Sequence, residues 1–182
     1  MTLWSPITLT MERRSVMSTE YGFSFAKERC VQCYGCEVAC KSWRDAALGV
    51  RWRRVYNIWQ GRYPKVKNLS ASVSCMHCAD PACVQACPVQ AIQKRAEDGI
   101  VVVDRSKCTG CKTCLKECPF GAPQFGADGK MQKCDMCLKE ADLSKEVPPC
   151  IETCPTKALQ FGKMDQKEKI AIERDIQKLM AM

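Results

Sequence analysis

The sequence predicts an α+β protein with little regular secondary structure, in which groups bound to cysteine hold short β-hairpins and helices together. Cysteine supplies 16 of the 182 residues, and such usage indicates a covalent or metal scaffold. Ten of these cysteines stand in Cys-x-x-Cys steps, with short apolar stretches between the groups. No stretch approaches the roughly 20 apolar residues of a membrane span, so we expect no direct span.

The cysteines fall into four quartets. The third, from Cys108 to Cys118, has steps of three, three and four residues and is closed by Pro119, which is the bacterial ferredoxin spacing for a [4Fe–4S] cluster. The first quartet has the same spacing, with Lys41 in place of the proline. The second has a longer middle step, and in the fourth twelve residues separate Cys137 from Cys150. No cysteine is left over, so we expect four [4Fe–4S] clusters as cofactors.

We expect the quartets to form two pairs, and the two quartets of each pair to exchange their fourth ligands, because two-cluster ferredoxins do so. The second and third quartets flank a hairpin turn at Asp98-Gly99 and would form an inner two-cluster unit. The first and fourth would form an outer unit around it. The alternative, in which each quartet closes on its own cluster, is disfavoured because a helical turn carries the fourth cysteine away. The expected iron ligands are Cys30, Cys33, Cys36 and Cys154 for cluster 1; Cys134, Cys137, Cys150 and Cys40 for cluster 2; Cys75, Cys78, Cys83 and Cys118 for cluster 3; and Cys108, Cys111, Cys114 and Cys87 for cluster 4.

The predicted organisation is two nested bacterial-type ferredoxin units. A flexible leader covers 1–20, the outer unit 21–69 and 123–163, the inner unit 70–122, and an amphipathic helix 164–182. Strands are expected at 21–25, 55–59 and 100–103, a helix within the first quartet, and a surface loop between Cys137 and Cys150. The basic and aromatic insert 51–74 fits a strand with a docking surface better than a single-stranded nucleic-acid site. The final helix would pack on its own domain, with docking on a partner as the alternative.

We identify no catalytic residue. The sequence has one histidine, His77, which is expected at the surface or beside a cluster, where it would at most tune a potential. Disulfides and zinc are weaker interpretations, because the cysteines form quartets and no signal peptide is visible. The formal charge of +8 matches four clusters of about −2 each, so nucleic acid is not expected as a partner. Lysines near the ligands that would raise potentials are Lys112, Lys116, Lys133 and Lys139.

Six motifs resemble the iron–sulfur subunit of dimethyl sulfoxide reductase and its relatives, over about residues 20–163. They are Tyr21-Gly-Phe, the first quartet with its following lysine, Ser74-Cys-x2-Cys-x2-Pro-Ala-Cys83, Asp98-Gly-Ile-Val-Val-Val-Asp104, Cys118-Pro-Phe-Gly-Ala-Pro-Gln124 and Lys133-Cys-Asp-x-Cys137.

The resemblance implies a non-catalytic electron-transfer subunit of an oxidoreductase. Its partners would be a larger molybdenum or tungsten bis-pterin catalytic subunit and a quinol-linked membrane subunit or another redox partner. It also implies the ligand exchange described above. The nitrate reductase branch replaces one cluster cysteine by tryptophan, whereas this sequence keeps cysteine there, so four [4Fe–4S] clusters are expected.

Two alternatives stay open. The sequence lacks the long carboxyl extension and the membrane helix of some relatives, which leaves room for a polyferredoxin subunit of a soluble complex resembling the tungsten aldehyde oxidoreductases. The second alternative is a free polyferredoxin that carries electrons to several enzymes. We expect a cytoplasmic location or a peripheral one at the cytoplasmic membrane, and export with a signal-bearing partner stays open.

Overall fold

The structure is a computed structural model that describes residues 20–138 and 147–182. The expected leader and most of the expected loop after Cys137 lie outside these residues. The described elements, in chain order, are β1 (Glu20–Phe25), the 3-10 turn η1 (Lys27–Arg29), α1 (Gly35–Trp43), β2 (Arg54–Arg62), β3 (Lys65–Val73), α2 (Ala82–Gln85), β4 (Ile92–Lys94), β5 (Val101–Val103), α3 (Thr113–Lys116), β6 (Gln124–Phe125), β7 (Met131–Gln132), α4 (Pro149–Glu152), β8 (Leu159–Met164) and α5 (Gln166–Met180). The expected α+β class with short hairpins is confirmed.

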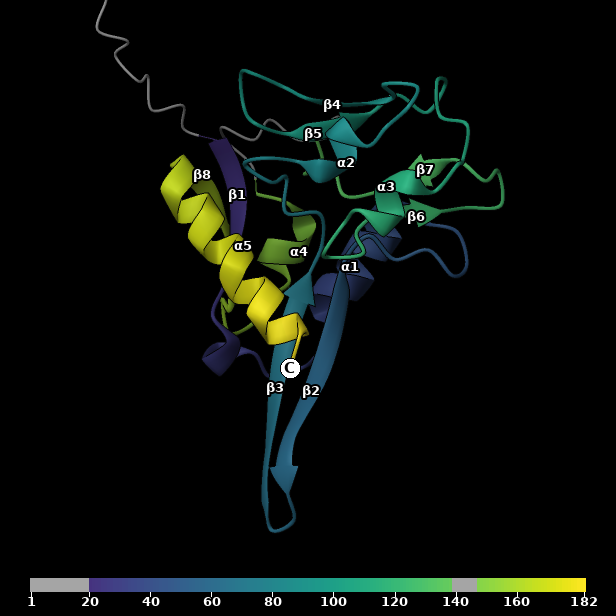
Figure 1. Ribbon diagram of the computed structural model, residues 1–182. Coiled ribbons are helices and arrows are strands. Elements are labelled where there is room, and N and C mark those ends of the chain that lie inside the picture. The colour runs from purple at the N-terminus through teal and green to yellow at the C-terminus, as the bar shows by residue number, and fades with distance from the viewer. Residues whose placement is uncertain (1–19, 139–146) are drawn as a thin grey trace, which may run out of the picture.

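The first and last strands of the described chain, β1 and β8, lie side by side (Figure 1). β1 pairs with β8 in an antiparallel sheet, from Glu20 opposite Met164 to Phe25 opposite Leu159. The ring of Tyr21 stacks on that of Phe161, with centroids 5.2 Å apart. α1 in turn packs against α4. Segments from both ends of the sequence therefore pair with each other.

The middle of the sequence carries two small hairpins and two single-turn helices. β4 pairs with β5 across the turn at Gly99, as the Asp98-Gly99 signal predicted, and β6 pairs with β7. α2 packs against α3 and β4. In Figure 1 these elements gather at one end of the molecule.

A long hairpin of β2 and β3 projects from the opposite end (Figure 1). The predicted strand at 55–59 is confirmed as part of β2, but the sequence analysis missed its partner β3. Gly61 makes the turn possible, since it has a φ of +84° and an added Cβ would lie 2.1 Å from the Lys65 carbonyl oxygen. The base of the hairpin is buried through Ala71 and Val73.

α5 confirms the expected C-terminal helix and packs against β1 and β3. Asp165 caps it by accepting a hydrogen bond from the Glu168 N–H at 2.8 Å. Ile176 and Leu179 are buried, so the apolar face packs on its own domain. Lys169 is buried as well and forms an ion pair with Glu20 at 2.7 Å. Among the helices in the described ranges, none is long and apolar enough to cross a membrane.

Candidate iron–sulfur centres

The four quartets share one local geometry. In each, the helix begins one residue before the third cysteine, so α1, α2, α3 and α4 carry Cys36, Cys83, Cys114 and Cys150 at their second position. The fourth cysteine always follows four residues later. Four residues of helix advance the backbone by about 6 Å, which separates the fourth thiol from the loop that holds the first three. The helix expected in the first quartet is thus confirmed, and the other quartets repeat it.

The loop before each second cysteine also repeats. The preceding residue has a left-handed backbone in all four quartets: Gln32 at a φ of 57°, His77 at 48°, Gly110 at 73° and Met136 at 58°. For residues other than glycine this conformation costs about 1 kcal/mol or more, and such strain gathers at functional sites. It turns the peptide so that neighbouring thiols face one space.

Two cavities are each lined by the cysteines of two quartets. One is lined by Cys87 from the second quartet together with Cys108, Cys111 and Cys114 from the third. The other is lined by Cys40 from the first quartet with Cys134, Cys137 and Cys150 from the fourth. In both, the cysteine from the other quartet is its fourth member.

Two of the other eight thiols, Cys78 and Cys36, are influenced electrostatically by cysteines of another quartet. Burial first, and then Glu173 and the thiols of Cys75, Cys118 and Cys83, raise the pKa of Cys78. In the outer part of the molecule, burial raises the pKa of Cys36, and the thiols of Cys150 and Cys154 raise it further.

Eight of the sixteen thiols have a pKa above the ordinary cysteine value. Burial is the main cause that raises the pKa of Cys40 to about 12 and those of Cys83, Cys114 and Cys137 to about 11. Iron bound at these sites would offset the free-energy cost of ionising buried thiols, and its binding would release the thiol protons.

Backbone N–H groups point at several sulfurs. The Ala91 N–H lies 3.3 Å from Cys87 Sγ, and the Ala122 N–H lies 3.4 Å from Cys118 Sγ. Both donors stand four residues after a fourth cysteine and follow a left-handed residue, Gln90 or Gly121. Hydrogen bonds to sulfur are among the features that set the potential of an iron–sulfur cluster.

The donor set fits [4Fe–4S] clusters. All sixteen cysteines lie in the described residues, and each is a free thiol. No three His, Cys, Asp or Glu side chains of the described ranges gather closely enough to hold a single metal ion. Eight of the cysteines instead line two shared cavities, four to each, which is the number of thiolates that one [4Fe–4S] cluster takes. A cluster bound there supplies one-electron redox chemistry, while the protein supplies the thiolates, the N–H donors and burial.

Two buried side chains correct or extend the sequence analysis. His77 is fully buried rather than at the surface, and its Nδ1 accepts a hydrogen bond from the Val101 N–H at 2.9 Å. Lys133, expected near the ligands, is buried and donates to the Val101 and Cys134 carbonyls. Lys112 and Lys116 are exposed, and Lys139 lies outside the described residues.

The lysine that follows the first quartet has a structural role that its spacing did not predict. Lys41 Nζ donates to the carbonyls of Ala46, Ala47 and Val50 at 2.9 to 3.0 Å. It thereby closes the segment that follows α1, where the other quartets have proline.

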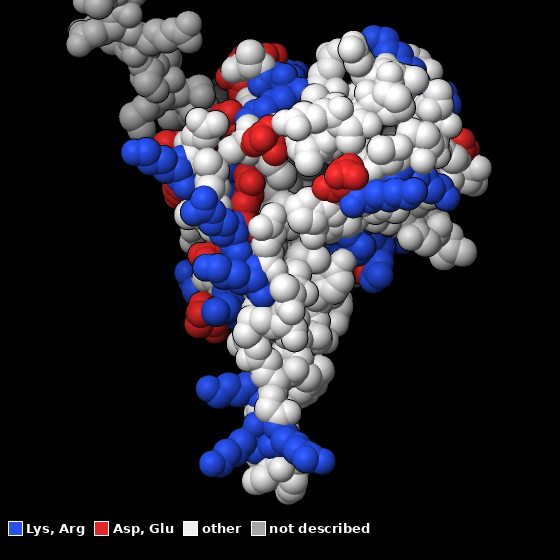
Figure 2. Space-filling view, viewed as in Figure 1, with Lys and Arg blue, Asp and Glu red and all other residues white. Residues whose placement is uncertain are grey.

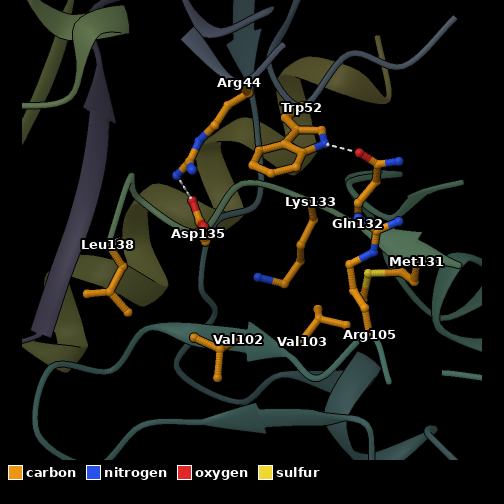
Figure 3. Close-up of a pocket in the computed structure, with 10 residues that line it drawn as sticks. All are labelled: Arg44, Trp52, Val102, Val103, Arg105, Met131, Gln132, Lys133, Asp135 and Leu138. Carbon is orange, nitrogen blue, oxygen red and sulfur yellow. Dashed lines mark hydrogen bonds and ion pairs between the residues drawn. The ribbon is translucent and has the colours of Figure 1, made fainter. Parts of the chain in front are cut away.

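A separate cavity lies between β5 and the segment that leads into β2 (Figure 3). Trp52 donates from its indole nitrogen to Gln132 at 3.1 Å, and Arg44 pairs with Asp135. Its lining, within the described part of the sequence, contains no cysteine. We therefore assign no cluster to it.

Thiol quartets on a repeated loop-and-helix unit define an iron–sulfur protein of the ferredoxin class. Residues 66–164 match the model of the 4Fe-4S dicluster domain. The protein is 43% identical to the B subunit of the anaerobic dimethyl sulfoxide reductase of Escherichia coli, over 84% of its own length and 78% of that subunit. It is 43% identical to the formate dehydrogenase iron-sulfur subunit of Wolinella succinogenes, over 80% and 82%, and 35% identical to the thiosulfate reductase electron transfer subunit PhsB of Salmonella typhi, over 84% and 80%.

The protein therefore belongs to the 4Fe-4S dicluster family of electron-transfer subunits. It has the role of an electron-transfer subunit of an oxidoreductase complex and not that of the catalytic subunit. The expected resemblance is confirmed.

Proposed function

We propose that the protein relays single electrons through four [4Fe–4S] clusters between a molybdenum or tungsten bis-pterin catalytic subunit and a quinol-linked membrane subunit or another redox partner. The observation that carries this proposal is the repetition of one thiol-bearing loop and helix four times. Thiolates occupy all four positions of each proposed cluster, so no iron is left open to a substrate. Electron transfer is the chemistry that such clusters supply.

The proposed ligand sets are those expected from the spacing, with one cysteine exchanged between paired quartets. Support comes from the two cavities, which group Cys87 with the third quartet and Cys40 with the fourth. The electrostatic influence of Cys118 on Cys78, and of Cys154 on Cys36, supports the other two sets. The pairing of β1 with β8, outside the elements of the middle quartets, supports the nested division into units.

The projecting β2–β3 hairpin is the proposed contact with the catalytic subunit. Its tip exposes Trp59 and Tyr63, which are 68% and 90% exposed. The basic side chains near the turn are Arg62, Lys65 and Lys67, and Figure 2 shows basic residues gathered at this tip. Residues 51–74 include no acidic residue. Aromatic and arginine side chains anchor protein interfaces, so the hairpin fits an acidic surface with an apolar centre.

The proposed location is the cytoplasm or the periphery of the cytoplasmic membrane, wherever the catalytic subunit places the complex. A cytoplasmic polyferredoxin that serves several enzymes would need no stable partner. Anaerobic purification distinguishes a subunit of a stable complex from a free polyferredoxin.

The test is anaerobic purification of the native protein, followed by metal analysis. We expect about sixteen iron and sixteen sulfide per molecule, together with a stably bound, much larger subunit that carries a pterin cofactor. Purification as a lone monomer with all clusters intact would contradict the subunit role. Iron far below sixteen per molecule in the intact complex would contradict the four clusters.

A further inference from the structure

The insert carries one arginine that is wholly buried. Arg53, immediately before β2, is 2% exposed, and its guanidinium lies 4.5 Å from the centre of the Phe23 ring. Its Nη1 donates to Ser72 Oγ at 3.2 Å. Its Nε and Nη2 have no hydrogen-bond partner among the described residues. A buried cation with two unpaired donors is costly, so a missing acceptor is indicated.

The surroundings show where that acceptor lies. Arg53 lines the same cavity as Cys40, Cys134, Cys137 and Cys150, which is the proposed site of cluster 2. Within the described ranges no carboxylate forms an ion pair with it. The groups near it that would carry negative charge, once they bind iron, are cysteine sulfurs. Burial opposes the charged form of Arg53, and the thiolates of Cys150, Cys134, Cys36 and Cys40 favour it, so that its pKa is raised.

The same side chain also reaches the neighbouring cluster. Ser72 Oγ, which accepts from Arg53, lies 3.4 Å from Cys36 Sγ. Cys36 belongs to the proposed ligand set of cluster 1. One guanidinium thus touches a cavity for one cluster and is one hydroxyl away from a ligand of the other.

We infer that Arg53 is a positioning residue that bridges the two outer clusters: its Nε–H and Nη2–H donate to sulfur of cluster 2, and its Nη1–H acts through Ser72 on cluster 1. This inference rests on the proposed function. Reduction adds one negative charge to a cluster, and a fixed cation with charge-assisted hydrogen bonds stabilises the reduced state more than the oxidised state. Arg53 therefore raises the reduction potential of cluster 2 most and that of cluster 1 less. An electron that enters this pair of clusters is more stable on cluster 2 when Arg53 is present.

The test uses the assembled complex and a redox titration followed by EPR. In Arg53→Met we expect the equilibrium constant for reduction of cluster 2 to fall about tenfold, which is about 59 mV for a one-electron couple. A smaller fall in the same direction is expected at cluster 1, and no change at the inner clusters. Cys137→Ser identifies the signal of cluster 2.

Two further variants complete the design. Arg51→Met removes a positive charge from the same segment, but Arg51 is half-exposed and pairs with Glu37 at 2.9 Å, so all four potentials should stay unchanged. Arg53→Lys keeps the charge with fewer fixed donors and should lower the equilibrium constant of cluster 2 about threefold. If Arg53→Met fails to load iron, the potential of cluster 2 in Arg53→Lys provides the test of the inference.

Unchanged potentials in a fully loaded Arg53→Met or Arg53→Lys variant would overturn the inference and leave Arg53 a packing residue. Lack of clusters in the unmodified complex would instead overturn the proposed function, so the two failures are distinct.

Discussion

Single residues in an unfavourable conformation shape each thiol loop. Gln32, His77 and Met136 adopt left-handed backbone angles at the position where the third quartet has Gly110. Glycine would avoid the steric cost, yet three loops keep a side chain there. His77 shows a reason, since its ring is buried and accepts the Val101 N–H. The side chain ties the loop to β5, which glycine would not do.

Buried ion pairs act at the same scale and make stability depend on pH. Burial opposes ionisation of Glu20, but hydrogen bonds from Lys169 and Lys94 outweigh it and hold the pKa of this carboxyl below its usual range. The two lysine nitrogens lie 2.7 and 2.8 Å from its oxygens. A carboxyl whose pKa is lower in the folded state stabilises the fold above its unfolded pKa, and loses this effect as pH falls through the folded pKa.

We expect Glu20→Gln to lower the free energy of unfolding by about 3 kcal/mol at neutral pH, because it leaves two lysines without their anion. The difference from the unmodified protein should shrink as pH falls below about 4, near the ordinary glutamate pKa. Anaerobic thermal unfolding between pH 3.5 and 7 measures it. Glu97→Gln, at an exposed pair with Arg95, should change stability by less than about 0.5 kcal/mol. A difference that does not vary with pH would exclude this role of Glu20.

At the scale of elements, the β2–β3 hairpin has two dissimilar ends. Its base is buried and carries Arg53 and Ser72 beside the cysteines. Its tip is exposed, basic and aromatic (Figure 2). Nine residues in each strand join these ends without a break in pairing. The hairpin therefore connects the proposed partner surface directly to the proposed outer clusters.

Charge reversal at the tip should weaken the complex. We expect Lys65→Glu combined with Lys67→Glu to reduce co-purification with the catalytic subunit at least tenfold, because like charges brought together across an interface cost several kcal/mol. Iron content should stay unchanged. Lys167→Glu with Lys178→Glu, at exposed positions on α5, is the matched control. Complex formation equal to that of the control would remove the hairpin from the interface.

At the scale of the whole molecule, paired elements link distant parts of the sequence. β1 meets β8, α1 meets α4, and the cavity lined by Cys40 also holds Cys150. Between them in the sequence stand α2, β4, β5 and α3, whose contacts join residues that are closer together along the chain. The two proposed units differ in sequence separation rather than in local geometry.

The proposed exchange predicts which cluster suffers when one ligand is lost. Cys118→Ser should perturb the cluster held by Cys75, Cys78 and Cys83 more than the one held by Cys108, Cys111 and Cys114. Cys87→Ser is the matched control and should show the reverse. Redox-titrated EPR of both variants compares the two signals. Equal damage to both clusters, or the opposite pattern, would contradict the exchange.

The sequence predicted the features that depend on spacing and local alternation. The quartets, β1, the helix at the first quartet, the turn at Asp98-Gly99 and α5 follow from residues near one another in the sequence. β3 was missed because its tip half is basic and exposed, although Leu69, Ala71 and Val73 alternate with polar residues and Gly61 marks the turn.

The tertiary roles of Arg53, Lys169 and Lys41 could not be read in the same way. A charged residue in a basic stretch ordinarily stays in solvent, and its burial depends on distant partners. Arg53 meets Ser72 and Phe23, and Lys169 meets Glu20, 149 residues away. No local pattern of residues carries that information.

The pairing of β1 with β8 also imposes an order on folding during synthesis. β1 leaves the ribosome early, but the sheet in which it lies has no other strand among the described residues. Until Leu159–Met164 has been translated, the edge of β1 is unpaired and Phe23 lacks the cover of Phe161. The segment from α2 to α3 has by then been made in full. The nascent polypeptide can therefore close its middle first, and its two ends meet only when β8 has followed.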